Sequence, residues 1–237
     1  MAITSRVLAA AAVALAALLA PSVPAVAAAN DAAVAAPVRV MPLGDSITYG
    51  AKSPGGYRVG LWQKFVAGGY SVDFVGSRTD GPSTLPDRNH EGHPGWVISQ
   101  IDSNIATWLR TYDPQTILLQ IGTNDMWHDP RGAPNRLSAL VDHITALAPN
   151  ARLFVAMITP ISGMDSTVRA FNATIPPMVK SKANSGKKVY LVDQYHALTT
   201  ADLADGVHPT ATGYYKMATT WYNALLSVPS SIGNRRT

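Results

Sequence analysis

The chain has 237 residues, a formal net charge of +4 and no cysteine. The lack of cysteine excludes a disulfide framework and a thiolate metal site, so packing of the core must stabilise the fold by itself. Lysine and arginine residues are scattered along the sequence instead of forming a stripe, which argues against nucleic acid as a partner.

Residues 1–29 have the pattern of a secretory signal peptide. Arg6 precedes a stretch over residues 7–20 that consists almost wholly of Ala, Val and Leu, and small residues follow it. This stretch is too short to cross a membrane comfortably, Pro21 and Pro24 break its continuation, and no second long apolar stretch occurs. We therefore expect a secreted protein without a membrane anchor, and the sequence leaves the cleavage site open.

The rest of the sequence is expected to form one domain. Its length is ample for a single hydrophobic core. We assign residues 30–37 to a lead-in, residues 38–228 to the domain and residues 229–237 to a polar tail, and we expect a monomer.

Apolar runs and amphipathic stretches alternate from residue 38 onward. Runs with the length and β-branched content of buried strands occupy residues 38–41, 71–75, 116–121, 153–158 and 188–192. Stretches with the apolar spacing of helices occupy residues 58–67, 97–109, 135–147, 165–183 and 213–226. Pro176 and Pro177 must kink or restart the fourth of these helices. Because such alternation gives parallel strands with helices on both faces, we predict a three-layer α/β/α sandwich around a five-stranded parallel sheet.

A loop over residues 77–95 is long for a compact domain, which favours a functional role. It contains His90, Glu91 and His93, which superficially resemble metal ligands. They lack a fourth ligand and the i, i+4 spacing of a helical zinc site, so we expect a structural or substrate-lining loop and no bound metal.

Three chemically complementary positions follow the first three predicted strands. In a parallel sheet, ligands bind beyond the carboxyl ends of the strands, near the point where strand order reverses. Ser46 supplies a hydroxyl there, Gly76 a backbone N–H without a side chain to obstruct it, and Asn124 a side-chain amide. A serine nucleophile needs N–H donors that hold the oxyanion of its tetrahedral intermediate, and Gly76 and Asn124 can provide them.

The serine also needs a base, and Asp205-Gly206-Val207-His208 provides one. An aspartate three residues before a histidine, with a glycine between them, can fold back to accept the Nδ1–H of the ring. The Nε2 atom then faces the serine as general base. The sequence thus predicts Ser46, Asp205 and His208 as the catalytic residues.

Each of these residues has a simpler explanation when it is taken alone. Ser46 could be a turn residue or a helix cap, Asn124 could cap the next helix, and residues 205–208 could form a surface loop. Their convergence on one edge of the sheet favours catalysis. Asp45 and Asp125 are expected to brace their loops by accepting backbone N–H bonds.

Four blocks together resemble the SGNH hydrolases, also called the GDSL esterases and lipases: Gly44-Asp45-Ser46, Gly76, Gly122-Thr123-Asn124-Asp125 and Asp205-Gly206-Val207-His208. The resemblance implies that Ser46 is the nucleophile of a triad with Asp205 and His208. It also implies an oxyanion hole formed by the N–H groups of Ser46 and Gly76 and the amide of Asn124. The leucine that usually follows the serine is Ile47 here, a conservative apolar change.

Longer segments are similar to secreted acetylxylan esterases of the third carbohydrate esterase family. They lie at residues 41–46, 55–58, 72–77, 91–96 and 182–190. This resemblance implies a flavodoxin-like fold and the removal of acetyl groups from xylan.

The aromatic residues divide into two groups. Tyr49, Trp96 and Trp127 fall in loops at the expected active edge and could form the floor of a sugar site. Three further tryptophans fall on helical apolar patterns and are expected in the core: Trp62, Trp108 and Trp221.

We therefore expect a serine esterase that deacetylates xylan, a related polysaccharide or a small ester through an acyl-enzyme, without a cofactor. Two alternatives stay open. A secreted lipase, phospholipase or thioesterase on the same scaffold would need a long apolar groove, which loops rich in Gly, Pro, Asp and His disfavour. A non-catalytic carbohydrate-binding protein would explain exposed aromatic residues but not the convergence of four complementary loops.

Overall fold

The computed structural model describes residues 1–2 and 36–235, and Ala36–Thr237 cluster as one compact unit. The predicted signal segment and lead-in lie almost wholly outside the described residues. None of the described helices is long and apolar enough to cross a membrane.

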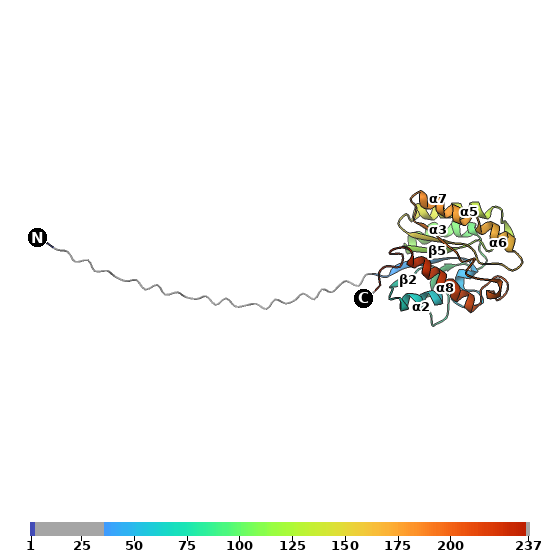
Figure 1. The fold of residues 1–237 in the computed structure, drawn as a ribbon, viewed down its shortest axis with the longest axis horizontal. Helices are drawn as coiled ribbons and strands as arrows, with labels where there is room; N and C mark the ends of the chain where they lie inside the picture. The colour runs from blue at the N-terminus through green and yellow to red at the C-terminus, as the bar shows by residue number, and fades with distance from the viewer. Residues whose placement is uncertain (3–35, 236–237) are drawn as a thin grey trace. The chain divides into compact units, whose positions relative to one another are not determined.

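A seven-stranded sheet forms the centre of the compact unit (Figure 1). Its strands are β1 (Val38–Gly44), β2 (Val72–Phe74), β3 (Arg78–Thr79), β4 (Asn89–Gly92), β5 (Thr116–Gln120), β6 (Arg152–Ala156) and β7 (Val189–Val192). Their order is β3-β4-β1-β5-β6-β7, and β2 also pairs with β1. All pairs are parallel except β3 with β4.

The prediction of a parallel sheet is confirmed, but the number of strands was wrong. The two additional strands, β3 and β4, form inside the segment predicted as a long loop. They have only 2 and 4 residues, and their sequences, RT and NHEG, are mostly polar. Neither strand therefore shows the apolar pattern that identifies a buried strand.

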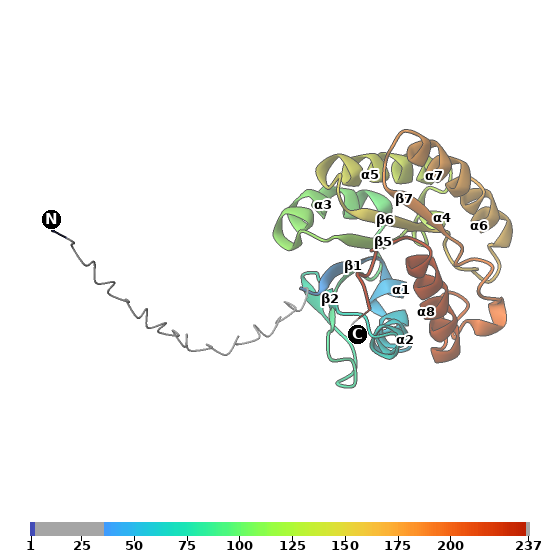
Figure 2. The same cartoon turned by 60° about the vertical axis from the view of Figure 1, so that its left-hand side comes forward.

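The helices confirm the three-layer arrangement. They are α1 (Ser46–Tyr49), α2 (Tyr57–Ala67), α3 (Ile98–Tyr112), α4 (Asp125–His128), α5 (Ala133–Leu147), α6 (Asp165–Asn172), α7 (Ile175–Asn184) and α8 (Ala211–Leu226), with a 3₁₀ turn at Thr200–Asp202. Figure 2 shows α3, α5, α6 and α7 on one side of the sheet and α2 and α8 on the other. The predicted helix over 165–183 is two helices, and Pro176 lies in the first turn of the second, where the missing N–H costs nothing.

The sheet is buried on both faces because its side chains alternate between two apolar clusters. Met41 and Leu43 of β1 belong to the cluster beneath α3 and α5. Val40 of β1 and Leu118 of β5 belong to the cluster beneath α2 and α8. This double burial explains why strands β1, β5 and β6 are nearly continuous apolar runs in the sequence.

The register brings the ends of three strands to one level. Gly44, the last residue of β1, pairs with Gln120 of β5 on one side and with Gly92 of β4 on the other. A Cβ at Gly44 would lie 2.1 Å from the carbonyl oxygen of Gln120, so the close approach of β1 and β5 requires glycine. The segments that follow these strands consequently meet at one edge of the sheet.

The predicted polar tail is partly a core element. Ser231 and Ile232 are buried, and the carbonyl of Ser231 accepts a hydrogen bond of 2.5 Å from Oγ1 of Thr116. The polar composition after residue 229 hides this contact because only one apolar side chain is involved.

Candidate active site

Ser46 lies at the start of the short helix α1, directly beyond the end of β1. Oδ1 of Asp45 accepts a hydrogen bond of 2.9 Å from the N–H of Ile47 and so caps this helix. Gly50 ends it in the left-handed conformation, with φ of 95°. The Ser46 side chain is largely buried, and its Oγ atom lies 2.9 Å from Nε2 of His208.

Asp205 and His208 lie in the loop before α8, and Asp205 holds this loop together. Its Oδ1 atom accepts the N–H groups of Val207, at 3.1 Å, and His208, at 2.8 Å. Its Oδ2 atom lies 2.9 Å from Nδ1 of His208. Although partial desolvation opposes them, these hydrogen bonds hold the pKa of Asp205 well below its usual range. A carboxylate at this position orients the imidazole so that Nε2 points at Ser46.

Gly76 follows β2 in an unusual conformation, with φ of 153°. A Cβ there would lie 2.3 Å from the carbonyl carbon and oxygen of His90. No described residue accepts the N–H of Gly76. A residue with a side chain could not pack this closely on β4, so the close approach explains the glycine.

Asn124 precedes α4 but does not cap it through its side chain. Its Nδ2 atom donates instead to the carbonyl oxygen of Trp96, at 2.8 Å. A primary amide has two N–H donors, so one remains for another acceptor.

The residues described above lie in a region whose sequence matches a known protein family. The model of the GDSL-like lipase/acylhydrolase family matches residues 43–216, which include Ser46, Gly76, Asn124, Asp205 and His208. The chain belongs to this family. The predicted family and enzyme class, a carboxylic ester hydrolase, are thereby confirmed.

Solved structures and curated proteins show which esterases this chain is similar to. This GDSL-like hydrolase is similar to a family 3 carbohydrate esterase of Clostridium thermocellum, with 40% identity and a TM-score of 0.78 over 83% of this chain and 99% of that one. A family 3 carbohydrate esterase from Talaromyces cellulolyticus is 31% identical, with a TM-score of 0.72 over 80% and 97%. A multidomain esterase of Ruminococcus flavefaciens is 35% identical over 213 residues, 78% of this chain. The chain spans only 28% of that protein, and 62% of a second curated relative, a putative endoglucanase X of Acetivibrio thermocellus.

Asp125 of the GDSL-like hydrolase braces its loop, as predicted. Its buried carboxylate accepts the N–H of Ile98 at the start of α3, at 3.0 Å. It also accepts Nε and one terminal nitrogen of Arg136 from α5, at 3.2 and 2.8 Å. The segment after β5 is therefore fixed to two helices, and Asn124 with it.

Asp45 braces the loop that carries Ser46, and its burial makes the stability of the protein depend on pH. Burial raises the pKa of Asp45 to about 6, from an ordinary value of 3.8, against the opposing effect of the Ile47 hydrogen bond. Because the folded state holds this proton more tightly, the group favours folding below about pH 4. That contribution is lost as the pH rises through 6, and the loss amounts to about 3 kcal/mol.

We therefore expect Asp45→Asn to stabilise the protein increasingly as the pH rises. Asparagine keeps an acceptor for the N–H of Ile47 but cannot ionise. The free energy of unfolding of the variant minus that of the wild type should rise by about 2 kcal/mol between pH 4 and pH 7. Urea titrations at a series of pH values measure this difference, and a difference independent of pH would contradict it.

Arg58 supports α1, the helix that begins with Ser46. No local pattern in the sequence reveals this role. Arg58 is completely buried in α2, and burial lowers its pKa to about 10. Its guanidinium donates to the carbonyls of Thr48 and Tyr49, at 3.1 and 3.0 Å, and to those of Asp80 and Arg88. A cation thus satisfies the last carbonyls of α1 and ties this helix to the segment after β2.

Lys52 is a second residue that sequence reasoning missed. Its Nζ atom lies 3.5 Å from Oδ2 of Asp205, and both side chains are partly exposed. It lines a cleft of about 390 Å³ with Tyr49 and Asp80. Its backbone is left-handed, with φ of 67°, which no local motif in the sequence indicates.

The His90 side chain has a partner of its own, whereas the Glu91 and His93 side chains contact each other. His90 accepts the N–H of Gly92 through Nδ1, at 2.9 Å, and burial lowers its pKa to about 2. Nε2 of His93 donates to Glu91, at 2.8 Å. Within residues 36–235, no group of three acidic, histidine or cysteine side chains could hold a metal ion.

The three aromatic residues proposed for a sugar site differ in exposure. Trp127 in α4 is 49% exposed. Trp96 is half-buried, and its ring stacks on that of His93 with centroids 4.2 Å apart. Tyr49 is also half-buried and meets the ring of His90 edge-on. Trp108 and Trp221 are buried and Trp62 packs on the core, as predicted.

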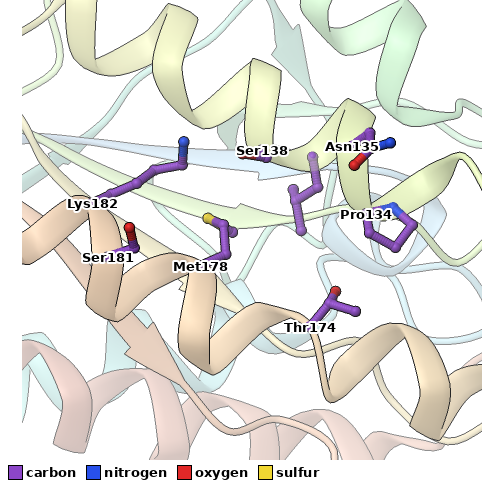
Figure 3. A pocket seen from close by; sticks show the side chains of 8 residues that line it. Pro134, Asn135, Ser138, Thr174, Met178, Ser181 and Lys182 are labelled. Carbon is purple, nitrogen blue, oxygen red and sulfur yellow. The ribbon is translucent and has the colours of Figure 1, made fainter.

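A separate cavity of about 300 Å³ opens between α5 and α7 (Figure 3). Ser138 and Ser181 line it, together with Met178 and Lys182. No histidine lines it, and Lys182, the one amine among its lining residues, is paired with Asp142 at 2.7 Å, so neither serine has a free base there. None of the predicted site residues lines this cavity. The edge beyond β1 and β5 is therefore the better candidate for ester chemistry.

Proposed function

We propose that this protein is a secreted deacetylase of acetylated xylan or a related polysaccharide, with Ser46, His208 and Asp205 as its catalytic triad. The observation that carries the chemistry is the pair of 2.9 Å contacts from Ser46 Oγ to His208 Nε2 and from His208 Nδ1 to Asp205 Oδ2. The geometry supports proton transfer from the serine to a histidine that the aspartate orients.

The proposed reaction has two steps. Ser46 attacks the ester carbonyl while His208 accepts its proton, and His208 then gives this proton to the departing sugar oxygen, which leaves as a hydroxyl. Water attacks the resulting acyl-enzyme with His208 again as base, which releases acetate and restores Ser46. The N–H groups of Ser46 and Gly76 and the second N–H of the Asn124 amide are proposed to hold the oxyanion in both steps.

The substrate assignment rests on the similarity to family 3 carbohydrate esterases, of which one is 40% identical over 83% of this chain. The proposed secretion rests on the sequence of residues 1–29. The cleft beside Lys52 and Tyr49 has polar groups in its lining, and Lys52 lies 3.5 Å from Asp205. Such a polar cleft next to the proposed triad suits sugar hydroxyls better than a long apolar chain.

Acetate release tests this function. The purified chain would be incubated with acetylated xylan and, separately, with a long-chain acyl ester, with Ser46→Ala as control. We expect acetate release that the control lacks and little hydrolysis of the long chain. Preference for the long chain would move the protein to the lipases, and equal release by the control would refute the proposed nucleophile.

Trp127 is proposed to contact the polysaccharide because its ring is exposed and follows Asn124 by three residues. Loss of a stacking ring removes about 1 kcal/mol of binding, so we expect Trp127→Ala to raise KM for acetylated xylan about fivefold. The KM for a small acetyl ester should not change. Trp62→Phe, away from this edge, is the control, and an unchanged KM for xylan in Trp127→Ala would remove the residue from the site.

A further inference from the structure

Glu91 is a completely buried carboxylate in β4. It lies between the segment that carries Gly76 and the segment that carries Asn124, the two proposed oxyanion donors other than Ser46. No lysine or arginine of the described residues forms an ion pair with it. Burying a carboxylate is costly unless hydrogen-bond donors surround it. The groups that donate hydrogen bonds to Glu91 therefore indicate the role of its buried charge.

Two of these donors belong to Ser77, the residue after Gly76. Oε1 of Glu91 accepts the N–H of Ser77 at 2.5 Å, and Oε2 accepts its hydroxyl at 2.9 Å. On the other side of Gly76, the N–H of Val75 donates to Val40 of β1 at 2.9 Å. Gly76 is thus held between two fixed neighbours, so the direction of its own N–H depends on Glu91.

The third donor leads to Asn124. Nε2 of His93 donates to Oε2 of Glu91 at 2.8 Å. The His93 ring stacks on the rings of both Trp96 and Trp108, with centroid distances of 4.2 and 4.9 Å. The carbonyl of Trp96 in turn accepts Nδ2 of Asn124 at 2.8 Å. The orientation of the Asn124 amide therefore also depends on Glu91, through two packed rings.

We propose that Glu91 is a positioning residue that sets the directions of both the Gly76 N–H and the Asn124 amide. The inference rests on the proposed function, because it assumes that these two groups hold the oxyanion. One buried charge then fixes two donors that come from different strands. Donors fixed in advance need no reorganisation when the negative charge develops, and this is what makes an oxyanion hole effective.

The test compares kcat and KM for a small acetyl ester, per folded molecule, in Glu91→Ala, Glu91→Gln, Asn124→Ala and the double variant Glu91→Ala/Asn124→Ala. Misplacing a donor by about 1 Å costs about 10²-fold, so we expect Glu91→Ala to lower kcat about 10²-fold with KM unchanged. Glu91→Gln keeps an acceptor for Ser77 and should lose less. Asn124→Ala should lose about 10²- to 10³-fold, and the double variant should lose less than the product of the two single losses.

Asp87→Ala is the matched control. Asp87 lies just before β4, the strand that contains Glu91. It accepts the N–H groups of Phe74, at 2.5 Å, and Asn89, at 3.3 Å, but neither Ser77 nor His93. It should lower the melting temperature and leave kcat of the folded protein unchanged. A merely structural role of Glu91 would give this same result.

These measurements distinguish a failure of the proposed oxyanion hole from a failure of the proposed role of Glu91. A wild-type rate in Asn124→Ala would refute the oxyanion assignment of the proposed function itself. A loss in Asn124→Ala with wild-type kcat in folded Glu91→Ala, or with multiplicative losses in the double variant, would refute only the role of Glu91. If Glu91→Ala does not fold, Glu91→Gln decides, because a wild-type kcat in that variant also overturns the inference.

Discussion

Replacing Ser46 by alanine should lower kcat for an acetyl ester by about 10⁶-fold, the loss that removal of a serine nucleophile typically causes. The Ser46 hydroxyl lies just beyond the end of β1 and 2.9 Å from Nε2 of His208, whose Nδ1 atom pairs with Asp205. The measurement is the initial rate of acetate release with equal amounts of folded protein, verified by circular dichroism.

The same loss should follow from His208→Ala, because the two residues act as a unit. The double variant Ser46→Ala/His208→Ala should be no worse than either single variant. A loss of less than about 10²-fold in Ser46→Ala would mean that another group performs the attack. Labelling by a serine-directed phosphonate should occur in the wild type and be absent in both single variants.

Replacing Asp205 by asparagine should lower kcat by about 10⁴-fold with little change in fold. Oδ1 of Asp205 accepts the backbone N–H groups of Val207 and His208. The oxygen of an asparagine amide will occupy that position, which places its NH₂ group against Nδ1 of His208. The ring must then carry its proton on Nε2, where it cannot accept the proton of Ser46.

The chain contains a matched control for this prediction. Asp193 and His196 have the same i, i+3 spacing, with Oδ1 accepting the N–H of His196 at 3.0 Å and Oδ2 lying 2.7 Å from its Nδ1. This pair is exposed and has no serine partner among the described contacts. Asp193→Asn should leave kcat unchanged. If Asp205→Asn had an equally small effect, the proposed role of the aspartate would be wrong.

The sequence predicts the strands of the sheet that are buried on both sides. The runs at β1, β5 and β6 are recognisable because each must be apolar on two faces, and their ends are correct to within three residues. The sequence does not predict β3 and β4. These strands of 2 and 4 mostly polar residues form because neighbouring strands pair with them, and they have no apolar pattern of their own. The break between α6 and α7 is predicted in kind, since two prolines restart a helix, but not in position.

The residues of the candidate site also fall into two groups, those that the sequence predicts and those that it does not. Ser46, Asp205 and His208 are found because each belongs to a short motif whose contacts are local or lie at a strand end. Arg58 is missed because its partners are backbone carbonyls up to 30 residues away, which leave no complementary side chain in the sequence. Glu91 and His93 are noticed, but as a poor metal site, because their connection to Gly76 and Asn124 exists only after β4 has paired with β1.

The 162 residues that separate Ser46 from His208 have a consequence for biosynthesis. The N–H groups and amide proposed to bind the oxyanion are all made before residue 125, whereas the proposed base arrives with the last loop, just before α8. We therefore expect a growing or truncated chain that ends before residue 205 to carry the Ser46 hydroxyl without this base and to lack esterase activity. Contacts so distant in sequence form late and slowly, so recovery of esterase activity after denaturation should report the completion of the whole fold and not the collapse of its core.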